Sequence, residues 1–474
     1  MSFKTRLLSF PDLNHSAVSI PKLSLFNQDN SQRYPYLLQS SAARENNTQY
    51  DILIACPQYL LTLNSDKTLS CTDSDVSLTS GFLDTLEKLY QHNKQAPSVE
   101  KATLPFTGGW FVYLSYEMAA EIEPCLSLAM LPEGQPLAVA ARCPAAIIHD
   151  KQNNQLIAVA EEKYEYLLDV LEQDYLKISG QSNASAIAEQ ENLKIEIASL
   201  IEDDAQAYLD QVERIKQYII EGDIFQANLS RQWQVTLKQP VDDAVLFDCL
   251  AKNNPSSFAA MACLENMTII SSSPERLVSV KNGMVETRPI AGTRPRDNDP
   301  QSDMALAKEL LAHPKEQAEH IMLIDLERND LGRVCRPGSI EVNELMVLES
   351  WQHVHHIVSN VRGELVDNKS PIDVLRSVFP GGTITGCPKV HCIEILAEME
   401  QQARGAYTGS LGYINNDGSM DFNILIRTMV RDKQGDNNKI TFRAGGGIVS
   451  DSIAENELEE TRAKAKGLLK IFKR

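Results

Sequence analysis

The segment that most constrains this chain is a run of alternating residues over positions 269–296, interrupted by Asn282-Gly283. Asn-Gly between two alternating runs is the strongest short-range signal for a β-hairpin, because a type I′ turn needs positive φ at both central residues. A two-residue loop also fixes the register of the two strands. The expected partners are Lys281 with Met284, Val278 with Thr287, and Glu275 with Ile290.

This register places Glu275 at the open end of the hairpin. Pro274-Glu275 would meet residues 290–292, Ile-Ala-Gly, on the returning strand. A carboxylic acid beside a glycine-containing, proline-bounded strand could protonate a leaving group. For a lone glutamate, an exposed position on an edge strand is the alternative, because glutamate side chains are mostly exposed.

Composition excludes several classes of protein. A net charge of −19 argues against a general nucleic-acid or anionic-membrane surface, but it leaves an anionic small molecule possible inside a cleft. Nine scattered cysteines without a Cys-x-x-Cys pair predict a reduced, cytoplasmic protein without structural zinc. The start lacks a signal-peptide core, and no apolar run approaches ~18 residues, so we expect no membrane association.

The chain divides into three predicted parts. Residues 1–178 contain short apolar runs typical of strands and a helix over 161–175, and the polar stretch 179–200 reads as a linker or surface loop. Residues 201–474 add longer helical patterns. The first expected helix begins at a capping box, Asp203 with Gln206, and ends at Gly222. A second helix is expected over 304–328, and the last begins at the capping box Ser452 to Glu455.

Two helical faces carry pairs of carboxylates. Glu316 and Glu319 are spaced i, i+3, and Glu457, Glu460 and Lys464 are spaced i, i+3, i+7. Facing pairs of glutamates could hold a hard cation such as Mg²⁺, which prefers oxygen ligands and takes only one or two carboxylates directly. The alternative is two solvated acidic faces.

The glycine-rich stretch over residues 379–389 leads into a helix. A phosphate-binding loop would need lysine directly after its last glycine. Here Cys387-Pro388 separates Gly386 from Lys389, so we reject nucleotide binding.

The segments Ser-Ser-Ser-Pro-Glu275-Arg and Thr-Arg-Pro-Ile-Ala-Gly-Thr-Arg-Pro-Arg resemble the signature segments of the chorismate-utilising enzymes. That family includes anthranilate synthase component I, aminodeoxychorismate synthase component I, and the isochorismate and salicylate synthases. The resemblance covers most of residues 200–474. It implies an α+β fold with an antiparallel β-sandwich core and outer helices.

The resemblance also implies roles for individual residues. Glu275 would protonate the departing 4-hydroxyl of chorismate, with His356 nearby. Mg²⁺ would be bound directly by Glu319 and Glu460, with Glu316 and Glu457 in its outer shell. The matching substrate positions are Thr383, Tyr407, Arg427, Gly445, Gly446, Gly447 and Lys464. An Arg fork, a Tyr hydroxyl and glycine N–H groups suit one carboxylate of chorismate. Taken singly, His356 is more often a packed or surface histidine, and Tyr407 a core aromatic.

Two positions bear on the product. Gln226 matches the position where water-using relatives carry an activating lysine, and glutamine cannot act as a base at neutral pH, which favours an amine product. Ala291 stands where many aminodeoxychorismate synthases carry a lysine nucleophile, and it resembles the anthranilate pattern instead. Ammonia would then attack C2 of chorismate directly.

The N-terminal half resembles the aminodeoxychorismate branch in residues 37–40, 50–57 and 108–117. In the family, the matching Leu-Leu-x-Ser and Asn-Pro-x-x-Phe segments line a tryptophan-sized pocket, which implies a pocket at Ser40, Ser257 and Phe258. The expected activity is therefore ammonia-dependent formation of 4-amino-4-deoxychorismate. Anthranilate synthase and a non-catalytic chorismate-binding subunit are the alternatives. No glutaminase nucleophile motif is present, which implies a separate glutamine amidotransferase partner.

Overall fold

The computed structural model describes residues 3–9, 20–41, 50–95, 104–181, 194–297, 299–350, 354–434 and 438–473. In this part of the chain, two large and mainly antiparallel sheets form the centre of the molecule. The first sheet, in spatial order, contains β1 (Phe3–Leu8), β9 (Gln155–Glu161), β8 (Ala145–Asp150), β3 (Tyr50–Ala55), β2 (Tyr36–Gln39), β12 (Phe258–Cys263), β13 (Met267–Ser273), β22 (Thr428–Asp432), β23 (Lys439–Ile448), β11 (Gln226–Leu237), β10 (Ile195–Glu202) and β24 (Phe472–Lys473), with β19 (Gly386–Cys387) beside β11.

The second sheet joins the predicted hairpin to N-terminal strands. In spatial order it contains β16 (Ile290–Pro295), β18 (Val354–Glu364), β15 (Met284–Thr287), β14 (Arg276–Lys281), β21 (Met420–Asn423), β20 (Ser410–Asn415), β6 (Gly109–Leu114), β7 (Ala138–Cys143), β4 (Tyr59–Leu63) and β5 (Leu69–Cys71), with β17 (Glu341–Ser350) beside β18.

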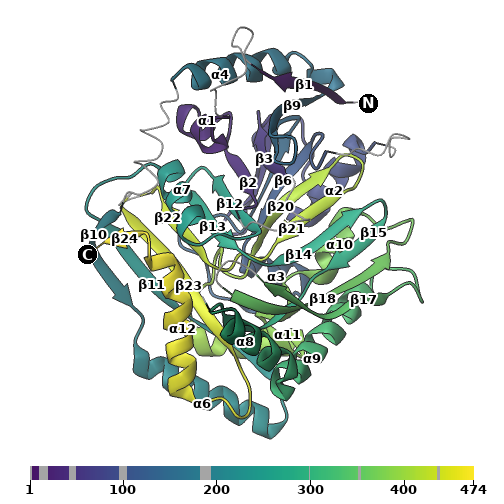
Figure 1. The fold of residues 1–474 in the computed structure, drawn as a ribbon. Coiled ribbons are helices and arrows are strands. Elements are labelled where there is room, and N and C mark those ends of the chain that lie inside the picture. The colour runs from purple at the N-terminus through teal and green to yellow at the C-terminus, as the bar shows by residue number, and fades with distance from the viewer. Residues whose placement is uncertain are drawn as a thin grey trace.

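Helices lie on the outside of the two sheets (Figure 1). They are α1 (Leu23–Asp29), α2 (Phe82–Asn93), α3 (Ala119–Ile122), α4 (Leu167–Gln181), α6 (Ala205–Glu221), α7 (Asp243–Asn253), α8 (Pro300–Ala312), α9 (Pro314–Leu331), α10 (Pro371–Val378), α11 (Lys389–Glu400) and α12 (Ala454–Leu469). The α+β sandwich expected from the sequence is confirmed. Among the described residues, no helix is long and apolar enough to span a membrane.

Both sheets cross the predicted boundary between the N-terminal and C-terminal parts. β2 pairs with β12 in the first sheet, and β6 pairs with β20 in the second. Most of the predicted linker, 179–200, lies outside the described residues. Its two ends belong to regular structure, because α4 continues to Gln181 and β10 begins at Ile195.

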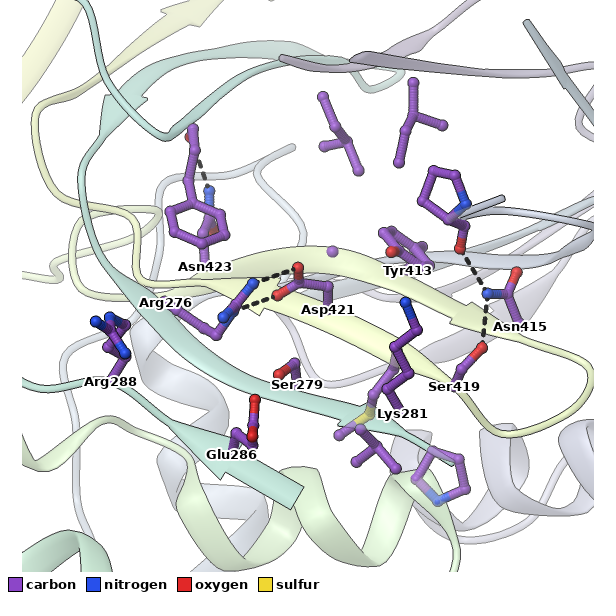
Figure 2. Close-up of a pocket in the computed structure, with 18 of the residues that line it drawn as sticks. Arg276, Ser279, Lys281, Glu286, Arg288, Tyr413, Asn415, Ser419, Asp421 and Asn423 are labelled. Carbon is purple, nitrogen blue, oxygen red and sulfur yellow. Dashed lines mark hydrogen bonds and ion pairs between the residues drawn. The ribbon is translucent and has the colours of Figure 1, made fainter. Parts of the chain in front are cut away.

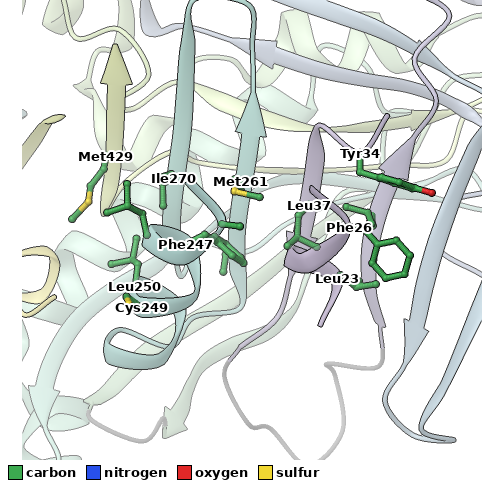
Figure 3. Close-up of a cluster of buried hydrophobic side chains, with 14 of the residues drawn as sticks. Leu23, Phe26, Tyr34, Leu37, Phe247, Cys249, Leu250, Met261, Ile270 and Met429 are labelled. Carbon is green, nitrogen blue, oxygen red and sulfur yellow. The ribbon is translucent and has the colours of Figure 1, made fainter. Parts of the chain in front are cut away.

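One apolar core fixes α1 and α7 to the first sheet (Figure 3). Phe247 and Leu250 of α7 are completely buried, and they belong to the same cluster as Leu37 of β2 and Ile270 of β13. Each fully buried side chain of this size contributes about 1.5–3 kcal/mol. This core therefore packs strands from both halves of the chain into one body.

The predicted hairpin is confirmed at its turn and wrong at its open end. Asn282 and Gly283 have positive φ, and Lys281 pairs with Met284. The ladder ends at the pair Ser279–Glu286, so Val278 does not pair with Thr287 in it. Pro289, which has no N–H to donate, interrupts the returning strand, and Ile290 pairs with Val358 of β18 rather than with Glu275.

Four helix predictions need correction at their ends. His313-Pro314 divides the predicted helix 304–328 into α8 and α9, because proline cannot continue a hydrogen-bonded helix.

The N-cap of α6 is Asp204 and not Asp203. The Asp203 carboxylate instead accepts a hydrogen bond from the backbone N–H of Gln232. The box predicted at Ser452 is absent: α12 begins after Ile453, and the Ser452 hydroxyl accepts from Val449 N. The helix predicted over 161–175 is α4, after a 3₁₀ turn at Glu162–Tyr164.

Candidate active site

Three consecutive glycines of β23 form a surface against which the predicted site residues lie. A Cβ built on Gly445 would come within 2.9 Å of the Tyr407 hydroxyl, and the Lys464 ammonium donates to the Gly445 carbonyl at 2.8 Å. A Cβ on Gly447 would overlap the Gln226 side-chain amide. Larger residues here would push these side chains away. The structure therefore brings residues from three separate segments, at 226, 407 and 464, against one glycine-containing strand.

Glu275 lies in a buried position suited to a proton donor. It is 6% exposed, and its Oε1 accepts a hydrogen bond from the Thr383 hydroxyl at 2.7 Å. Burial raises the pKa of Glu275 to about 7, against the Thr383 hydrogen bond and the charges of Arg427 and Lys464, which lower it. A carboxyl with this pKa is substantially protonated near neutral pH and can act as a general acid.

Arg427 supplies a cation facing Glu275. Its guanidinium makes no hydrogen bond or ion pair with any residue in the described ranges, and burial lowers its pKa while the charge of Glu275 raises it. Arg427 also has a φ of 52°, a conformation that is uncommon for non-glycine residues and is found in turns and at functional sites. A half-buried arginine available in this way can bind a carboxylate.

His356 is buried and neutral. Its Nδ1 donates to the Gly292 carbonyl at 3.3 Å, and burial together with the charge of Arg427 lowers its pKa to about 4. Tyr407 is also buried, and burial raises its pKa to about 12, so its hydroxyl remains a hydrogen-bond donor. Neither side chain carries charge at neutral pH, and both can orient a polar ligand.

Three of the four predicted metal-binding carboxylates lie beside two adjacent glycines. A Cβ on Gly446 would be 3.3 Å from Glu457 Oε2 and 3.4 Å from Glu460 Oε1, and one on Gly447 would be 3.5 Å from Glu319 Oε1. The fourth, Glu316, instead pairs with Arg294 at 3.3 Å. The all-oxygen donor set suits Mg²⁺ in chemical type.

These carboxylates do not form a dense metal-binding cluster by themselves. In the described ranges, no three His, Cys, Asp or Glu side chains come together as a group able to hold a metal ion. A site with two direct carboxylates and several waters needs no such group. The assignment of Glu319 and Glu460 as ligands therefore stays a prediction.

Comparison with known proteins places this geometry in a family. The sequence matches the chorismate binding enzyme family over residues 34–470. The chain belongs to the chorismate binding enzymes. It is 41% identical to aminodeoxychorismate synthase component 1 of Bacillus subtilis over 372 residues, 76% of each chain. It is 35% identical to anthranilate synthase component 1 of a Synechocystis strain over 472 residues, 94% of this chain and 91% of the relative.

Solved structures of chorismate enzymes share this fold. Anthranilate synthase component I from Streptococcus pneumoniae superposes with a TM-score of 0.77 at 29% identity, covering 90% of this chain and 93% of that one. The menaquinone-specific isochorismate synthase of Escherichia coli has a TM-score of 0.69 at 16% identity, over 99% and 95% of the two chains. At 16% identity, the similarity to the isochorismate synthase shows a shared fold only.

A large cavity of this chorismate binding enzyme is lined by residues on both sides of Glu275 in the sequence. It measures about 840 Å³, and Ser40, Ser257 and Phe258 all line it, as predicted from separate segments. Pro274 and Arg276 line it too, but Glu275 between them does not. Figure 2 shows Arg276 of β14 paired with Asp421 of β21 at this cavity. Glu275, Thr383 and Arg427 are therefore not part of the cavity's lining, and the cavity's ligand stays a prediction.

Sequence reasoning missed Arg404, a buried residue that connects several parts of the site. Its guanidinium donates to Asn228 O at 2.6 Å, to Ile384 O at 3.2 Å and to Glu400 at 2.7 and 2.8 Å. It therefore joins β11, the loop that contains Thr383, and α11. The only sequence signal was its place three residues before Tyr407, which gives no indication of the two carbonyls it contacts.

Ala291, the second position that bears on the product, is 6% exposed and pairs with Ile357 of β18. Its strand bulges at Gly292, where φ is 61° and where a Cβ would lie 2.8 Å from Glu316 Oε2. The alanine therefore lies next to residues from α9 and β18. It does not lie opposite Glu275 in a hairpin ladder.

Proposed function

We propose that this chorismate binding enzyme converts chorismate and ammonia to 4-amino-4-deoxychorismate. The observation that carries the proposal is Gln226, which is 5% exposed and donates through Nε2 to Glu319 at 2.9 Å. An amide held at this position cannot deprotonate water. Ammonia, unlike water, needs no base to become a nucleophile, so the site suits an amine-forming reaction.

Acid catalysis would come from Glu275. With its pKa raised to about 7, it would donate a proton to the 4-hydroxyl, which leaves as water while ammonia adds at C2. The resulting Glu275 carboxylate would take a proton from the new ammonium group. The reprotonated Glu275 would then return this proton to the C2 amine, which would leave as ammonia while a second ammonia adds at C4 to give the 4-amino product.

Substrate binding would use the cations that face Glu275. Arg427 would bind one carboxylate of chorismate, assisted by the Tyr407 hydroxyl beside Gly445. Mg²⁺, when held by Glu319 and Glu460, would supply positive charge for the other carboxylate. The family also suggests a glutamine amidotransferase partner, because the curated relatives are named as component 1 of their synthases.

Anthranilate synthase is the second candidate, favoured by Ala291. A lysine at this position would permit covalent attack on C2, and the small buried alanine does not. Without that lysine, the 2-amino intermediate could instead eliminate pyruvate to give anthranilate. The relatives include both enzymes at similar identity.

Product identification separates the two candidates. The purified chain is incubated with chorismate, ammonium and Mg²⁺, with and without aminodeoxychorismate lyase. The proposal predicts 4-aminobenzoate only when lyase is present. Anthranilate fluorescence without lyase would replace the proposal with the second candidate, and no turnover of chorismate would indicate a non-catalytic subunit.

A further inference from the structure

A buried ion pair, Arg404 with Glu400, lies next to the predicted substrate-binding residue Tyr407. The guanidinium donates to both carboxylate oxygens, at 2.7 and 2.8 Å, and both side chains are almost completely buried. Burying such a pair costs desolvation energy, and a well-packed hydrophobic pair of similar volume is often at least as stable. Stability alone therefore gives little reason for two charges at this position.

Arg404 holds both the ring and the backbone of Tyr407. Its guanidinium carbon lies 5.8 Å from the centre of the Tyr407 ring, within the range of a cation–π contact. Its backbone carbonyl accepts from Tyr407 N at 3.2 Å, and its Nη1 donates to the Thr408 hydroxyl at 3.3 Å. The Thr408 hydroxyl in turn donates to the Tyr407 carbonyl at 2.6 Å. The position of Tyr407 therefore depends on this arginine.

The same ion pair is attached to the glycine strand that the Tyr407 hydroxyl approaches. A Cβ built on Gly445 would lie 2.9 Å from that hydroxyl. Glu400 accepts from Ser230 N at 2.9 Å and from Ser230 Oγ at 2.8 Å, and Ser230 is the partner of Gly445 in the β11–β23 ladder. The pair therefore fixes Tyr407 relative to this part of β23.

Residues from the N-terminal half of the chain fix Arg404 itself. The guanidinium carbon lies 4.6 Å from the centre of the Tyr116 ring. The Glu117 carboxylate accepts from Arg404 N at 2.7 Å and from Gly405 N at 3.2 Å. These contacts do not involve Tyr407, so Arg404 can act as the support and Tyr407 as the residue that is supported.

We propose that Arg404 is a positioning residue for chorismate: it holds the Tyr407 hydroxyl at Gly445, where this hydroxyl donates to a carboxylate of the substrate. The inference rests on the proposed function, in which Tyr407 assists in binding that carboxylate. Arg404 acts through Tyr407, because its own guanidinium donates to Glu400 and to two backbone carbonyls. Lysine cannot replace it, since an ammonium lacks the planar fork that binds Glu400 through two nitrogens.

Chorismate binding without turnover tests this role. Isothermal titration calorimetry with Mg²⁺ and without ammonium gives the dissociation constant of chorismate for the parent, Arg404→Lys, Tyr407→Phe and the double variant. Each single variant should bind chorismate about tenfold more weakly, the effect of one hydrogen bond to a charged group. The loss in the double variant should also stay at about tenfold, because Arg404 acts through the hydroxyl that Tyr407→Phe removes. Independent effects would instead multiply to about a hundredfold.

Arg142→Lys is the matched control for the loss of a buried ion pair. Arg142 pairs with Glu161 at 2.6 Å, is similarly buried, and lies 5.9 Å from the Trp110 ring, but it belongs to β7, whose neighbours are β4 and β6. Its dissociation constant for chorismate should equal that of the parent, whereas its thermal unfolding temperature should fall about as far as that of Arg404→Lys. If Arg404→Lys does not fold, Glu400→Gln removes the charge of the partner, keeps its shape, and takes the same place in the comparison.

Three results would overturn the positioning role while leaving the proposed function in place. They are multiplying losses in the double variant, parental binding by Arg404→Lys, and an equal loss of binding in Arg142→Lys. Parental binding by Tyr407→Phe would overturn the inference together with the role of Tyr407 in substrate binding. The proposed reaction is tested separately by its product, which does not form in this measurement without ammonium.

Discussion

The carboxyl of Glu275 accepts a hydrogen bond from the hydroxyl of Thr383 across 2.7 Å, although 108 positions separate the two residues. The contact connects the β13–β14 segment to the 3₁₀ turn Gly382–Ile384. It favours the ionised carboxylate, whereas burial favours the protonated acid, and the balance leaves the pKa of Glu275 at about 7. The acid strength of this group therefore depends first on its burial, and the Thr383 hydrogen bond is the strongest influence in the opposite direction.

The first prediction is a pH dependence with a defined sign. If protonated Glu275 is the active form, kcat/KM for chorismate should fall as pH rises through about 7. Thr383→Val removes a bond that stabilises the carboxylate, so the pKa should increase and the fall should move to higher pH. Thr385→Val is the control, because that hydroxyl bonds Gly381 O and Gly382 O instead. A shift to lower pH in Thr383→Val would contradict the assignment.

The second prediction concerns the metal. Glu319→Gln or Glu460→Gln should reduce turnover to near zero, because an amide binds Mg²⁺ much more weakly than a carboxylate. Thermal unfolding should change little, since Glu460 is about half exposed. Glu459→Gln, on the exposed side of α12 and paired with Arg462, should keep parental activity. Near-normal turnover of either site variant at low Mg²⁺ would show that the ligand assignment is wrong.

Local sequence signals predicted turns and helix ends better than they predicted which strands pair. The turn at Asn282-Gly283 and the stop at Gly222 follow from backbone conformation alone, and both are confirmed. The Glu275–Ile290 pair failed because β16 leaves β14 and pairs with β18, a choice made by strands far away in sequence. Pro314, by contrast, is a local signal that divides the predicted helix 304–328.

In the candidate site, too, some residues were predictable from the sequence and others were not. The glycines of β23 and the residues predicted to lie near them do come together, because family motifs carry long-range information that periodicity lacks. Arg404 was missed, since its role depends on contacts with backbone carbonyls that no spacing rule identifies. Glu316 pairs with Arg294, and its place in the outer shell of Mg²⁺ stays a prediction.

The third prediction concerns selection of the nucleophile. Gln226→Lys would place an amine where the present amide meets Glu319, and a neutral lysine could accept a proton from water. Some isochorismate-like product should then form alongside the amine product. Chromatography of the products at high conversion measures the ratio. Amine products alone would mean that position 226 does not select the nucleophile.

The fourth prediction concerns Ala291. The unmodified enzyme should form no covalent adduct with chorismate in the presence of Mg²⁺ and the absence of ammonia. Position 291 carries a buried alanine, which has no amine that could attack C2. Ala291→Lys should capture chorismate covalently if the longer chain fits, although crowding should cost about 1–3 kcal/mol of stability. Intact-mass spectrometry measures both. An adduct on any lysine of the unmodified enzyme would rule out direct ammonia attack at C2.

The most direct measurement of the central claim is the position of nitrogen in the product. The enzyme is supplied with ¹⁵N-ammonium, chorismate and Mg²⁺, and the reaction is followed by NMR. The account predicts transient ¹⁵N at C2, final ¹⁵N at C4, and no pyruvate in the absence of lyase. ¹⁵N-anthranilate with one equivalent of pyruvate would contradict it.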